Sequence, residues 1–440
     1  MDVVHPICCG IDVHQAQVTA CLRRVVSGGT VSKELKEFPT TTQGLLEFKA
    51  WLVENDCPVV AMESTGVYWK PVYHILNDAV EVIVGNSRDI KIIPGKKTDD
   101  ADADWISELL AHGLIRPSFV PSPEFCAMRD LTRTRVKIVE MRTQAKNRVH
   151  KTLEDCNIKL STFVSDVFGV SGRQMLDALV AGERNAKVLA QMARGKMKRK
   201  IAQLELALTG QFTEHHGRLI KLSLEQIDLF NRQLETMDAQ MSELFAPYAS
   251  EIERLCSIPG IEETAARAIL AEIGVDMSRF ATPERLASWA GISPGNNESA
   301  GKKRKGRTRK GNRWLRRILG QCGWNTRKGS SFLGQTFRRH NKRLGGKKAA
   351  MAVGHKILVI IYHLLNDGTY YEEQRYEARR GKGEQHQINR AVKQLESLGF
   401  TVVLQQPPET LQPSPRLEAE LSTSSGLASQ MGGTEQAAAT

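Results

Sequence analysis

Apolar segments that end in an acidic residue are the feature of the N-terminal region that most constrains its fold. Residues 6–24, PICCGIDVHQAQVTACLRR, predict two β-strands joined by a short turn, and Asp12 lies at the end of the first strand. Residues 57–69, CPVVAMESTGVYW, predict a third strand, which ends in Glu63 and is followed by an amphipathic helix. With a further strand expected at residues 81–87, strands alternate with helices, and this pattern predicts an α/β domain with an at least partly parallel sheet.

A cluster of acids marks the start of the next predicted helix. Residues 94–105 read PGKKTDDADADW, and Thr98 is a suitable N-cap for a helix from Asp99 to about Ala111. Acids in a first turn are ordinary, because they favour the positive end of the helix dipole. At about 100° per residue, however, Asp99 and Asp102 share the face of the apolar residues. That apolar stripe consists of Ile106, Leu109 and Leu110. The acids on the opposite face, which we expect to be solvated, are Asp100, Asp104 and Glu108.

Two strands and one helix are thus predicted to bring four carboxylates to one edge of the sheet. Inward-facing carboxylates are costly unless they are paired or bound to a cation. A lone acid near a strand end more often caps a turn, so the prediction depends on the four acids together. Such a cluster is the type of ligand set that holds two magnesium ions for phosphodiester cleavage. The predicted catalytic and metal-binding residues are Asp12, Glu63, Asp99 and Asp102.

The chain is strongly basic, with a formal net charge of +12 and a pI near 9.3. Residues 301–317, GKKRKGRTRKGNRWLRR, concentrate this charge and interleave it with glycines and one Trp. A charge run is usually a solvated face, but a run of one sign repels itself unless phosphates neutralise it. We therefore expect nucleic acid as the partner. The predicted contacts in this block are Lys302, Lys303, Arg304, Lys305, Arg307, Arg309, Lys310 and Arg313.

A long helical region is expected after residue 120. Residues 124–160 form a basic helical stretch, and residues 216–248 carry apolar side chains in an interrupted 4-3 spacing with Asn231 in the seam. This spacing is compatible with a coiled-coil arm that pairs subunits, and also with a helix packed within its own chain. The seam residues are Ile220, Leu224, Ile227, Leu234, Met241 and Leu244 or Phe245.

Two helices around a tight turn are expected at residues 255–274, LCSIPGIEETAARAILAEIG, and this arrangement resembles a helix-hairpin-helix. Turns of that type present backbone NH groups to a phosphate without reading bases. Pro259, Gly260 and Ile261 are therefore candidate DNA contacts. A Pro-Gly pair between two helices can also be only a turn.

Composition argues against a membrane-spanning or secreted protein. The longest apolar run, residues 351–365, contains His355, Lys356 and His363 and is not expected to span a membrane. The N-terminus lacks the regions of a signal peptide, so we expect a cytoplasmic protein. The eight cysteines form no Cys-x-x-Cys pair and are expected to be reduced core residues.

Three of these segments resemble the motifs of a known family, the Asp-Glu-Asp-Asp insertion-sequence transposases. They are GIDVH, MESTGVYWKPVY and GKKTDDADADW. In the family, the third motif has the form Lys-Thr-Asp-x-x-Asp-Ala, and its two aspartates correspond to Asp99 and Asp102. Residues 279–319 resemble the C-terminal transposase domain of the same family, so the resemblance spans roughly residues 5–370. It implies an α/β RNase H-like (RuvC-like) N-terminal domain, an α-helical coiled-coil region and a mainly α-helical C-terminal transposase domain with the helix-hairpin-helix.

The resemblance also implies an activity, namely excision and insertion of the chain's own insertion sequence by strand exchange. It implies Mg²⁺ as cofactor, donor and target DNA and a structured noncoding bridge RNA as partners, a homo-oligomer from dimer to tetramer, and a location at the bacterial nucleoid. Nothing in composition or spacing indicates the RNA. The family places a catalytic serine in a Ser-x-Gly-Lys pattern, which Ser299 to Lys302 match and Ser293 does not. Without the resemblance, such a serine is usually only a loop residue.

Two other classes of protein stay open. A metal-dependent junction-resolving nuclease would use only the carboxylates and water, and it would leave Ser299 without a chemical task. In a non-catalytic helix-hairpin-helix DNA-binding protein, the unfavourable free energy of clustering the four acids would have no explanation.

The chain is long enough for two or three domains. We expect a RuvC-like catalytic domain at residues 1–120, a helical and coiled-coil region at 121–250, the C-terminal transposase domain at 251–373, a short extension at 374–404 and a disordered tail at 405–440.

Overall fold

The structure, a computed structural model, divides into two compact units, Met1–Tyr371 and Glu372–Thr440. It describes residues 2–25, 30–64, 66–87, 90, 99–293, 298–299, 302–303, 311–374, 388–390 and 392–404. For residues 99–101, 298–299 and 302–303 it describes the backbone and not the side chains. The predicted N-cap Thr98 and the predicted tail at residues 405–440 lie outside the described residues.

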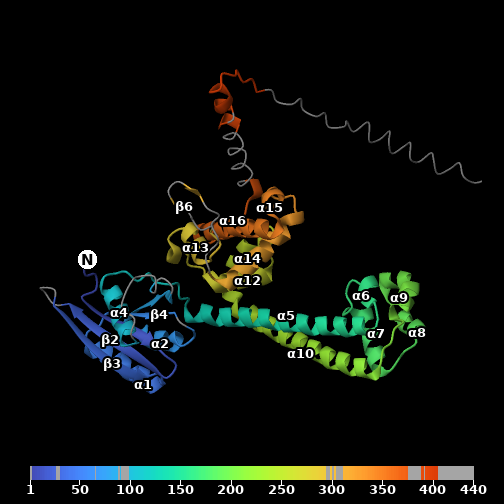
Figure 1. Cartoon of the computed structure of the whole chain (residues 1–440), viewed down its shortest axis with the longest axis horizontal. Helices are drawn as coiled ribbons and strands as arrows, with labels where there is room; N and C mark the ends of the chain where they lie inside the picture. Colours follow the sequence, from blue (N-terminus) through green and yellow to red (C-terminus); the bar gives the residue numbers. More distant parts are fainter. Residues whose placement is uncertain are drawn as a thin grey trace, which may run out of the picture. The chain divides into compact units, whose positions relative to one another are not determined.

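The N-terminal part of the first unit is built on a five-stranded mixed sheet with the order β3-β2-β1-β4-β5 (Figure 1). The pairs β1–β2 and β2–β3 are antiparallel, whereas β1–β4 and β4–β5 are parallel. The strands are β1 (Ile7–Val13), β2 (Gln17–Val25), β3 (Val31–Pro39), β4 (Val59–Glu63) and β5 (Glu81–Gly85). The predicted α/β region with a partly parallel sheet is confirmed, and the mixed sheet is consistent with a RuvC-like domain.

Helices cover both faces of this sheet, because side chains alternate between the faces along each strand. Helices α1 (Thr42–Glu54) and α2 (Trp69–Leu76) pack on one face, and α4 (Asp99–Ala111) packs on the other. The core under α4 consists of Cys8, Val59, Ala61, Ile90, Ile106, Leu109, Leu110, Ala111 and Ile115. The bounds of α4 agree with the predicted helix.

The sequence pattern does not predict strand β3 or helix α1. Most of β3 is exposed and charged, and Phe38 is its one buried residue, so the alternation that indicates a half-buried strand is missing. Charges on an edge strand protect it from pairing with other chains, and this hides its identity in the sequence. Helix α1 begins after Thr41, whose side chain accepts a hydrogen bond from the Gly44 amide at 3.2 Å.

A helical region follows the sheet. Its two long helices are α5 (Pro123–Asp155) and α10 (Glu214–Leu244), which lie side by side (Figure 1). Between them in sequence come α6 (Leu160–Phe163), α7 (Val170–Ala181), α8 (Ala186–Gln191), the 3-10 helix η1 (Gly195–Lys200) and α9 (Ile201–Leu208). These short helices share one hydrophobic core with the end of α5 and the start of α10.

Helices α5 and α10 are antiparallel and bury the predicted seam within the chain. Arg135 donates to Asp238 at 2.6 Å near one end of the pair, and Arg142 donates to Asn231 at 2.9 Å further along. The buried seam residues are Ile220, Leu224, Ile227, Leu234, Met241 and Phe245. Of the two alternatives for this spacing, the structure therefore has packing within the chain, and these side chains are not available to pair subunits.

Short helices make up the rest of the first unit. They are η2 (Ala246–Tyr248), α11 (Ala249–Cys256), α12 (Glu263–Ile273), η3 (Met277–Phe280), α13 (Pro283–Trp289), α14 (Arg313–Asn325), η4 (Thr326–Lys328), α15 (Phe332–Leu344) and α16 (Gly346–Asp367), with the strands β6 (Glu298–Ser299) and β7 (Lys302–Lys303) between α13 and α14. Within the described part of the chain, α16 alone is long and apolar enough to cross a membrane. Because its apolar residues are buried against α13, α14 and α15, α16 is the core helix of this region.

Candidate metal centre and nucleic-acid interface

Asp12 and Glu63 lie at the same end of two neighbouring parallel strands. The register of β1 and β4 pairs Ile11 with Met62, so one further step brings Asp12 beside Glu63. Ala61, two residues before Glu63, is buried in the core under α4. Because side chains alternate along a strand, both acids belong to the face of the sheet that α4 covers.

Helix α4 crosses strand β1 at Gly10. A Cβ atom on Gly10 would overlap the carbonyl of Ala103 and the amide of Ser107, so only glycine allows the helix to come this close. The Cys8 thiol donates to the Ser107 carbonyl at 3.5 Å. Because the earlier strand residue meets the later helix residue, α4 runs opposite to β1, and its first turns lie toward Asp12.

Those first turns contain the other two predicted ligands, Asp99 and Asp102. Asp102 lies one turn before Ile106, which is 2% exposed, but Asp102 itself is exposed. The expectation of a buried carboxylate is therefore wrong for Asp102, because the line of α4 that meets the sheet runs through the buried residues Ala103 and Ser107 and leaves Asp102 beside it. An exposed carboxylate near the ends of β1 and β4 is accessible to a cation. The backbone of Asp99 lies in the first turn, and its side chain lies outside the description.

A neighbouring histidine contacts one of the acids. His14 Nε2 lies 2.9 Å from Asp12 Oδ2, and Asp12 is 21% exposed. Among the described side chains, no group of three or more His, Cys, Asp or Glu residues is arranged to hold a metal ion. That set contains Asp12, Glu63 and Asp102 but not the side chain of Asp99. Carboxylate oxygens are the donors that magnesium prefers, so the chemistry of the four predicted residues fits this ion.

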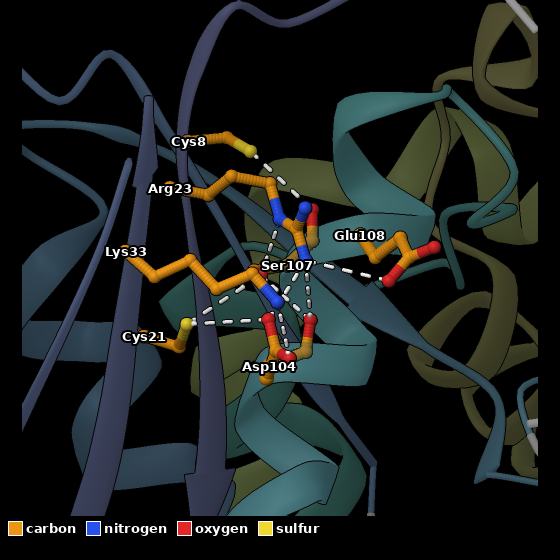
Figure 2. A network of polar contacts seen from close by, with 7 residues as sticks. All are labelled: Cys8, Cys21, Arg23, Lys33, Asp104, Ser107 and Glu108. Atoms are coloured by element: carbon orange, nitrogen blue, oxygen red, sulfur yellow. Dashed lines mark hydrogen bonds and ion pairs between the residues drawn. The ribbon is translucent and has the colours of Figure 1, made fainter. Parts of the chain in front are cut away.

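The opposite flank of α4 is held by a buried cation. Arg23 on β2 is 5% exposed, and its guanidinium donates to Asp104 Oδ1 at 2.7 Å and to Ser107 Oγ at 2.9 Å (Figure 2). Lys33 on β3 donates to Asp104 Oδ2 at 2.6 Å, and Glu108 lies 3.4 Å from Arg23. Strands β2 and β3 thereby fix the rotation of α4 about its axis, and with it the direction of the first-turn acids.

The prediction that the outward acids are solvated is consequently wrong for Asp104, whereas the Glu108 side chain is 45% exposed. A helix wheel assigns their flank to solvent, but the sheet continues beyond β1 into β2 and β3, whose Arg23 and Lys33 reach it. Burial alone would raise the pKa of Asp104, but the hydrogen bonds and charges of Lys33 and Arg23 outweigh burial and lower this pKa below its ordinary value. Asp100, the third acid of this predicted set, has its side chain outside the description.

Two cysteines contact this network: Cys8 Sγ donates to the Ser107 carbonyl at 3.5 Å, and Cys21 Sγ donates to Asp104 Oδ1 at 3.7 Å (Figure 2). All eight cysteines are free, and six are buried, whereas Cys126 and Cys256 are partly exposed. Burial raises the pKa of Cys8 to about 12 and that of Cys57 to about 11. Protonated thiols are poor nucleophiles and poor metal ligands, so a role in packing fits these residues.

The predicted turn between two helices is present, joining α11 to α12 at residues 257–262. Gly260 has a φ of +92° and lies against the end of α14, where a Cβ atom would meet the Cys322 carbonyl. The Ile261 amide donates to the Ile258 carbonyl at 3.1 Å, within the turn itself. The acids Glu262 and Glu263 stand at the start of α12. In the Pro259-Gly260-Ile261 turn, the Ile261 amide is therefore already hydrogen-bonded, and the neighbouring acids are negatively charged. Neither feature favours phosphate binding.

A buried acid, Glu272, connects three helices, and the sequence pattern does not predict this role. Glu272 on α12 is 1% exposed, and Arg133 of α5 donates to both of its oxygens at 2.8 Å. Asn312, just before α14, donates to Glu272 Oε2 at 2.6 Å and caps α14 by accepting the Trp314 amide at 3.0 Å. The signal in the sequence is a single acid within the apolar run ARAILAEIG. This junction fixes the point at which the basic block enters α14.

A tryptophan surrounded by cations stands at that point. The Trp314 ring is 4.9 Å from the Arg313 guanidinium, 5.7 Å from that of Arg133 and 5.5 Å from Lys137 Nζ. Arg313 is exposed and is the one predicted contact whose side chain the structure describes. Lys302 and Lys303 are described by their backbone in β7. The remaining predicted contacts, Arg304, Lys305, Arg307, Arg309 and Lys310, lie outside the described residues.

The predicted nucleophile lies in a short hairpin. Strands β6 and β7 pair Ser299 with Lys302 and Glu298 with Lys303. The Ser-x-Gly-Lys segment thus places its serine opposite its lysine in the backbone register. The side chains of both residues lie outside the description.

Comparison with known proteins now connects the two regions. A family model described as a transposase, of the DEDD type of IS110 elements, matches residues 9–158, and a model of the IS116/IS110/IS902 transposase family matches residues 252–333. The two matched segments together span more than half of the chain and contain all the predicted site residues. The chain belongs to the IS110/IS116/IS902 family of transposases.

Curated relatives agree with this family. A protein named as a family 20 transposase from Pseudomonas aeruginosa is 24% identical over 265 residues, which is 59% of this chain and 69% of that protein. A protein named as transposase y4qE from Sinorhizobium fredii is 26% identical over 235 residues, 52% of this chain and 48% of its own length. The chain thus matches about half of the length of the second relative.

Proposed function

We propose that this chain is a DNA transposase whose N-terminal domain cleaves DNA with the carboxylates Asp12, Glu63, Asp99 and Asp102. The observation that supports this most is the register of β1 and β4, which brings Asp12 beside Glu63 on the face under α4. The family of the chain is one of DNA-transposing enzymes, and DEDD-type domains use divalent metal in general. Transposition is therefore the reaction that these acids serve.

The four carboxylates would hold two magnesium ions, which would neutralise charge on the transferring phosphate and activate the attacking oxygen. The protein's own contribution is to hold the acids still. Gly10 lets α4 lie close to β1, and the Arg23–Asp104 pair sets the rotation of α4. A cation at Asp12 would also replace the contact with His14, which stands 2.9 Å from that carboxylate.

Ser299 is proposed as the nucleophile of strand exchange. Its Oγ would bond to the phosphorus while the bond from phosphorus to the leaving strand's oxygen breaks, and the hydroxyl proton ends on that oxygen. The phosphoserine ester keeps the bond energy, so the strands rejoin by the reverse step without an external energy source. Attack by water would instead leave a hydrolysed break. The hairpin register that sets Ser299 opposite Lys302 supports a cation near the developing charge.

The partners would be donor and target DNA, with a noncoding bridge RNA as guide and a homo-oligomer as the working form. Membership of a transposase family supports DNA as a binding partner. The RNA and the oligomer follow from the resemblance alone, and the seam of α10 does not provide the subunit interface, because it is buried within the chain.

The test uses the purified full chain with supercoiled donor and target DNA in Mg²⁺ and in EDTA. We expect a joined product that needs the divalent ion and the four acids. Cleavage of a branched junction without any joined product would instead indicate a resolving nuclease, and binding without cleavage would indicate a non-catalytic protein. Sequencing of copurified RNA tests the guide, and the absence of a defined transcript from DNA flanking the gene would contradict it.

A further inference from the structure

The longest region of one-sided charge in the chain contains the basic block at residues 301–317 and continues well beyond it. No Asp or Glu occurs between Glu298 and Asp367. The family match ends at residue 333, so most of α15 and all of α16 fall outside it. The basic side chains of this later part have no role in the site described above.

Helices α14, α15 and α16 pack against one another (Figure 1). Exposed cations gather where they meet. We call this the Trp324 surface. Its exposed or partly exposed members are Trp324, Arg327, Lys328, Arg338, Arg339, Lys342, Arg343, Lys347 and Lys348. Among the described residues, none of these cations forms an ion pair with a carboxylate. The charge of this surface is therefore not neutralised by the described part of the chain.

Contacts around Trp324 hold the three helices together at this surface. Trp324 is 43% exposed, the Arg327 guanidinium lies 5.1 Å from its ring, and the Phe337 ring lies 5.7 Å away, edge to face. A Cβ on Gly346 would strike the indole, so the start of α16 touches it. Arg338 donates to the Gly329 carbonyl at 2.7 Å, which ties α15 to the end of η4.

The positions of two lysines are unfavourable unless the Trp324 surface binds an anion. Lys347 and Lys348 stand in the first turn of α16, where the positive end of the helix dipole disfavours cations. His340 is also surrounded by cations: burial lowers its pKa, and the charges of Arg339, Arg343 and Lys356 lower it further. A polyanion would convert this mutual repulsion into attraction.

We propose that the Trp324 surface binds the sugar-phosphate backbone of duplex DNA. The proposal rests on the function proposed above, because a DNA-transposing enzyme must hold duplex DNA outside its reaction centre. Duplex DNA carries one negative charge per about 1.7 Å of helix axis, so it is complementary in charge to a surface with several unneutralised cations. Contacts of this kind position the duplex and do not read its sequence.

The test compares two charge-neutralised triple variants of the full chain in EDTA, where no cleavage occurs. In the first, Lys342, Lys347 and Lys348 are each replaced by Gln. In the control, the exposed residues Lys187, Arg218 and Lys221 of α8 and α10 are replaced by Gln, so both variants lose three positive charges. Binding of a 30-base-pair duplex is measured by fluorescence anisotropy against salt concentration.

We expect the first variant to bind duplex about tenfold more weakly or worse at about 0.1 M salt, with a log–log salt slope shallower by roughly one unit per lost contact. The control should stay within about twofold of wild type. Thermal unfolding should be unchanged or slightly raised in the first variant, because two unfavourable first-turn cations are removed.

Three results would overturn the proposal. Equal weakening in both variants would indicate a response to net charge alone, and no weakening in either would indicate a solvated face. The third result concerns other anions, namely a single-stranded RNA of equal length and vesicles of anionic lipid. If the first variant binds one of these less well than wild type does while its duplex binding is unchanged, the surface belongs to that partner. Because binding is measured without metal, a failure of the carboxylate site in cleavage assays leaves this outcome unaffected.

Discussion

The sheet edge near β1 and β4 and the region of α14 to α16 divide the chemistry of the chain between them. The first has carboxylates at strand ends and at the start of α4, whereas the second has no acid between Glu298 and Asp367. Carboxylates attract cations and repel phosphates, and exposed lysines and arginines do the reverse. Separate regions can therefore bind metal and DNA without interfering with each other, and changes in one region should alter cleavage or binding but not both.

The largest expected effect is at Ser299. Ser299→Ala should form no covalent protein–DNA adduct and no recombinant while it retains DNA binding, because the hydroxyl that forms the ester is gone. Ser293→Ala is the matched control and should retain both products. An adduct trapped on a nicked substrate with Ser299→Ala, with the modified peptide mapped elsewhere, would remove this residue from the mechanism.

The next effect concerns the acids of the sheet. Glu63→Gln should reduce Mg²⁺-dependent cleavage by about three orders of magnitude or more, since a lost metal ligand removes several kcal/mol of transition-state stabilisation. Duplex affinity in EDTA should stay within about twofold of wild type. A parallel fall in affinity would mean that the acidic and basic regions are not separate in function.

Two acids two residues apart on α4 sharpen the comparison further. Asp104→Asn should lower the free energy of unfolding by about 1–3 kcal/mol, because the buried Arg23 loses its nearer charged partner and keeps only Glu108, while cleavage persists at low temperature. Asp102→Asn should change the free energy of unfolding by less than about 0.5 kcal/mol, because Asp102 is exposed, while cleavage is lost. Chemical denaturation and cleavage rates measured together on both variants separate the two roles. If Asp104→Asn lost cleavage without losing stability, the assignment of the two faces of α4 would be wrong.

A smaller effect is expected in the basic block. Replacing Arg307, Arg309 and Lys310 by Gln should weaken duplex binding by about tenfold at moderate salt and make the log–log salt slope shallower by roughly one unit per lost phosphate contact. Anisotropy titrations across salt concentrations measure both quantities. An unchanged slope would mean a charge run that is merely solvated.

The smallest expected effect is a pH dependence. Asp104 has a folded-state pKa below its ordinary value of 3.8, so its contribution to stability is complete above that pH and is lost as the pH falls through the folded-state pKa. The difference in unfolding free energy between wild type and Asp104→Asn should therefore shrink below about pH 4. A difference that stays constant down to pH 2 would contradict the ion pair.

The elements that carry the candidate N-terminal site could largely be predicted, because their signals are local in sequence. An apolar run that ends in an acid marks the end of a strand, and this placed Asp12 and Glu63 at the ends of β1 and β4. The acid-rich start and the apolar stripe marked α4 with the observed bounds. Neighbouring parallel strands then bring their ends to one edge, so pairing of the two acids follows from the fold class.

Contacts between distant segments could not be predicted from single helices. A helical wheel of α4 contains no information on β2, so it predicts that Asp104 is solvated. In the structure Arg23, which is 81 residues away in the sequence, contacts Asp104. The spacing along α10 shows that a stripe is buried but not whether α5 or another subunit buries it. Glu272 reads as an isolated acid in an apolar helix, because its partners come from α5 and from the residue before α14.

The central claim, that Asp12, Glu63, Asp99 and Asp102 form a divalent metal site, is tested most directly by Mn²⁺ binding followed by electron paramagnetic resonance. Wild type and Asp104→Asn, held at a temperature where both are folded, should bind Mn²⁺ with the same stoichiometry, and Mg²⁺ should displace it. Asp12→Asn and Glu63→Gln should each bind Mn²⁺ about tenfold more weakly or worse, because a charged oxygen ligand is lost. Unchanged Mn²⁺ binding in both Asp12→Asn and Glu63→Gln would contradict the metal site.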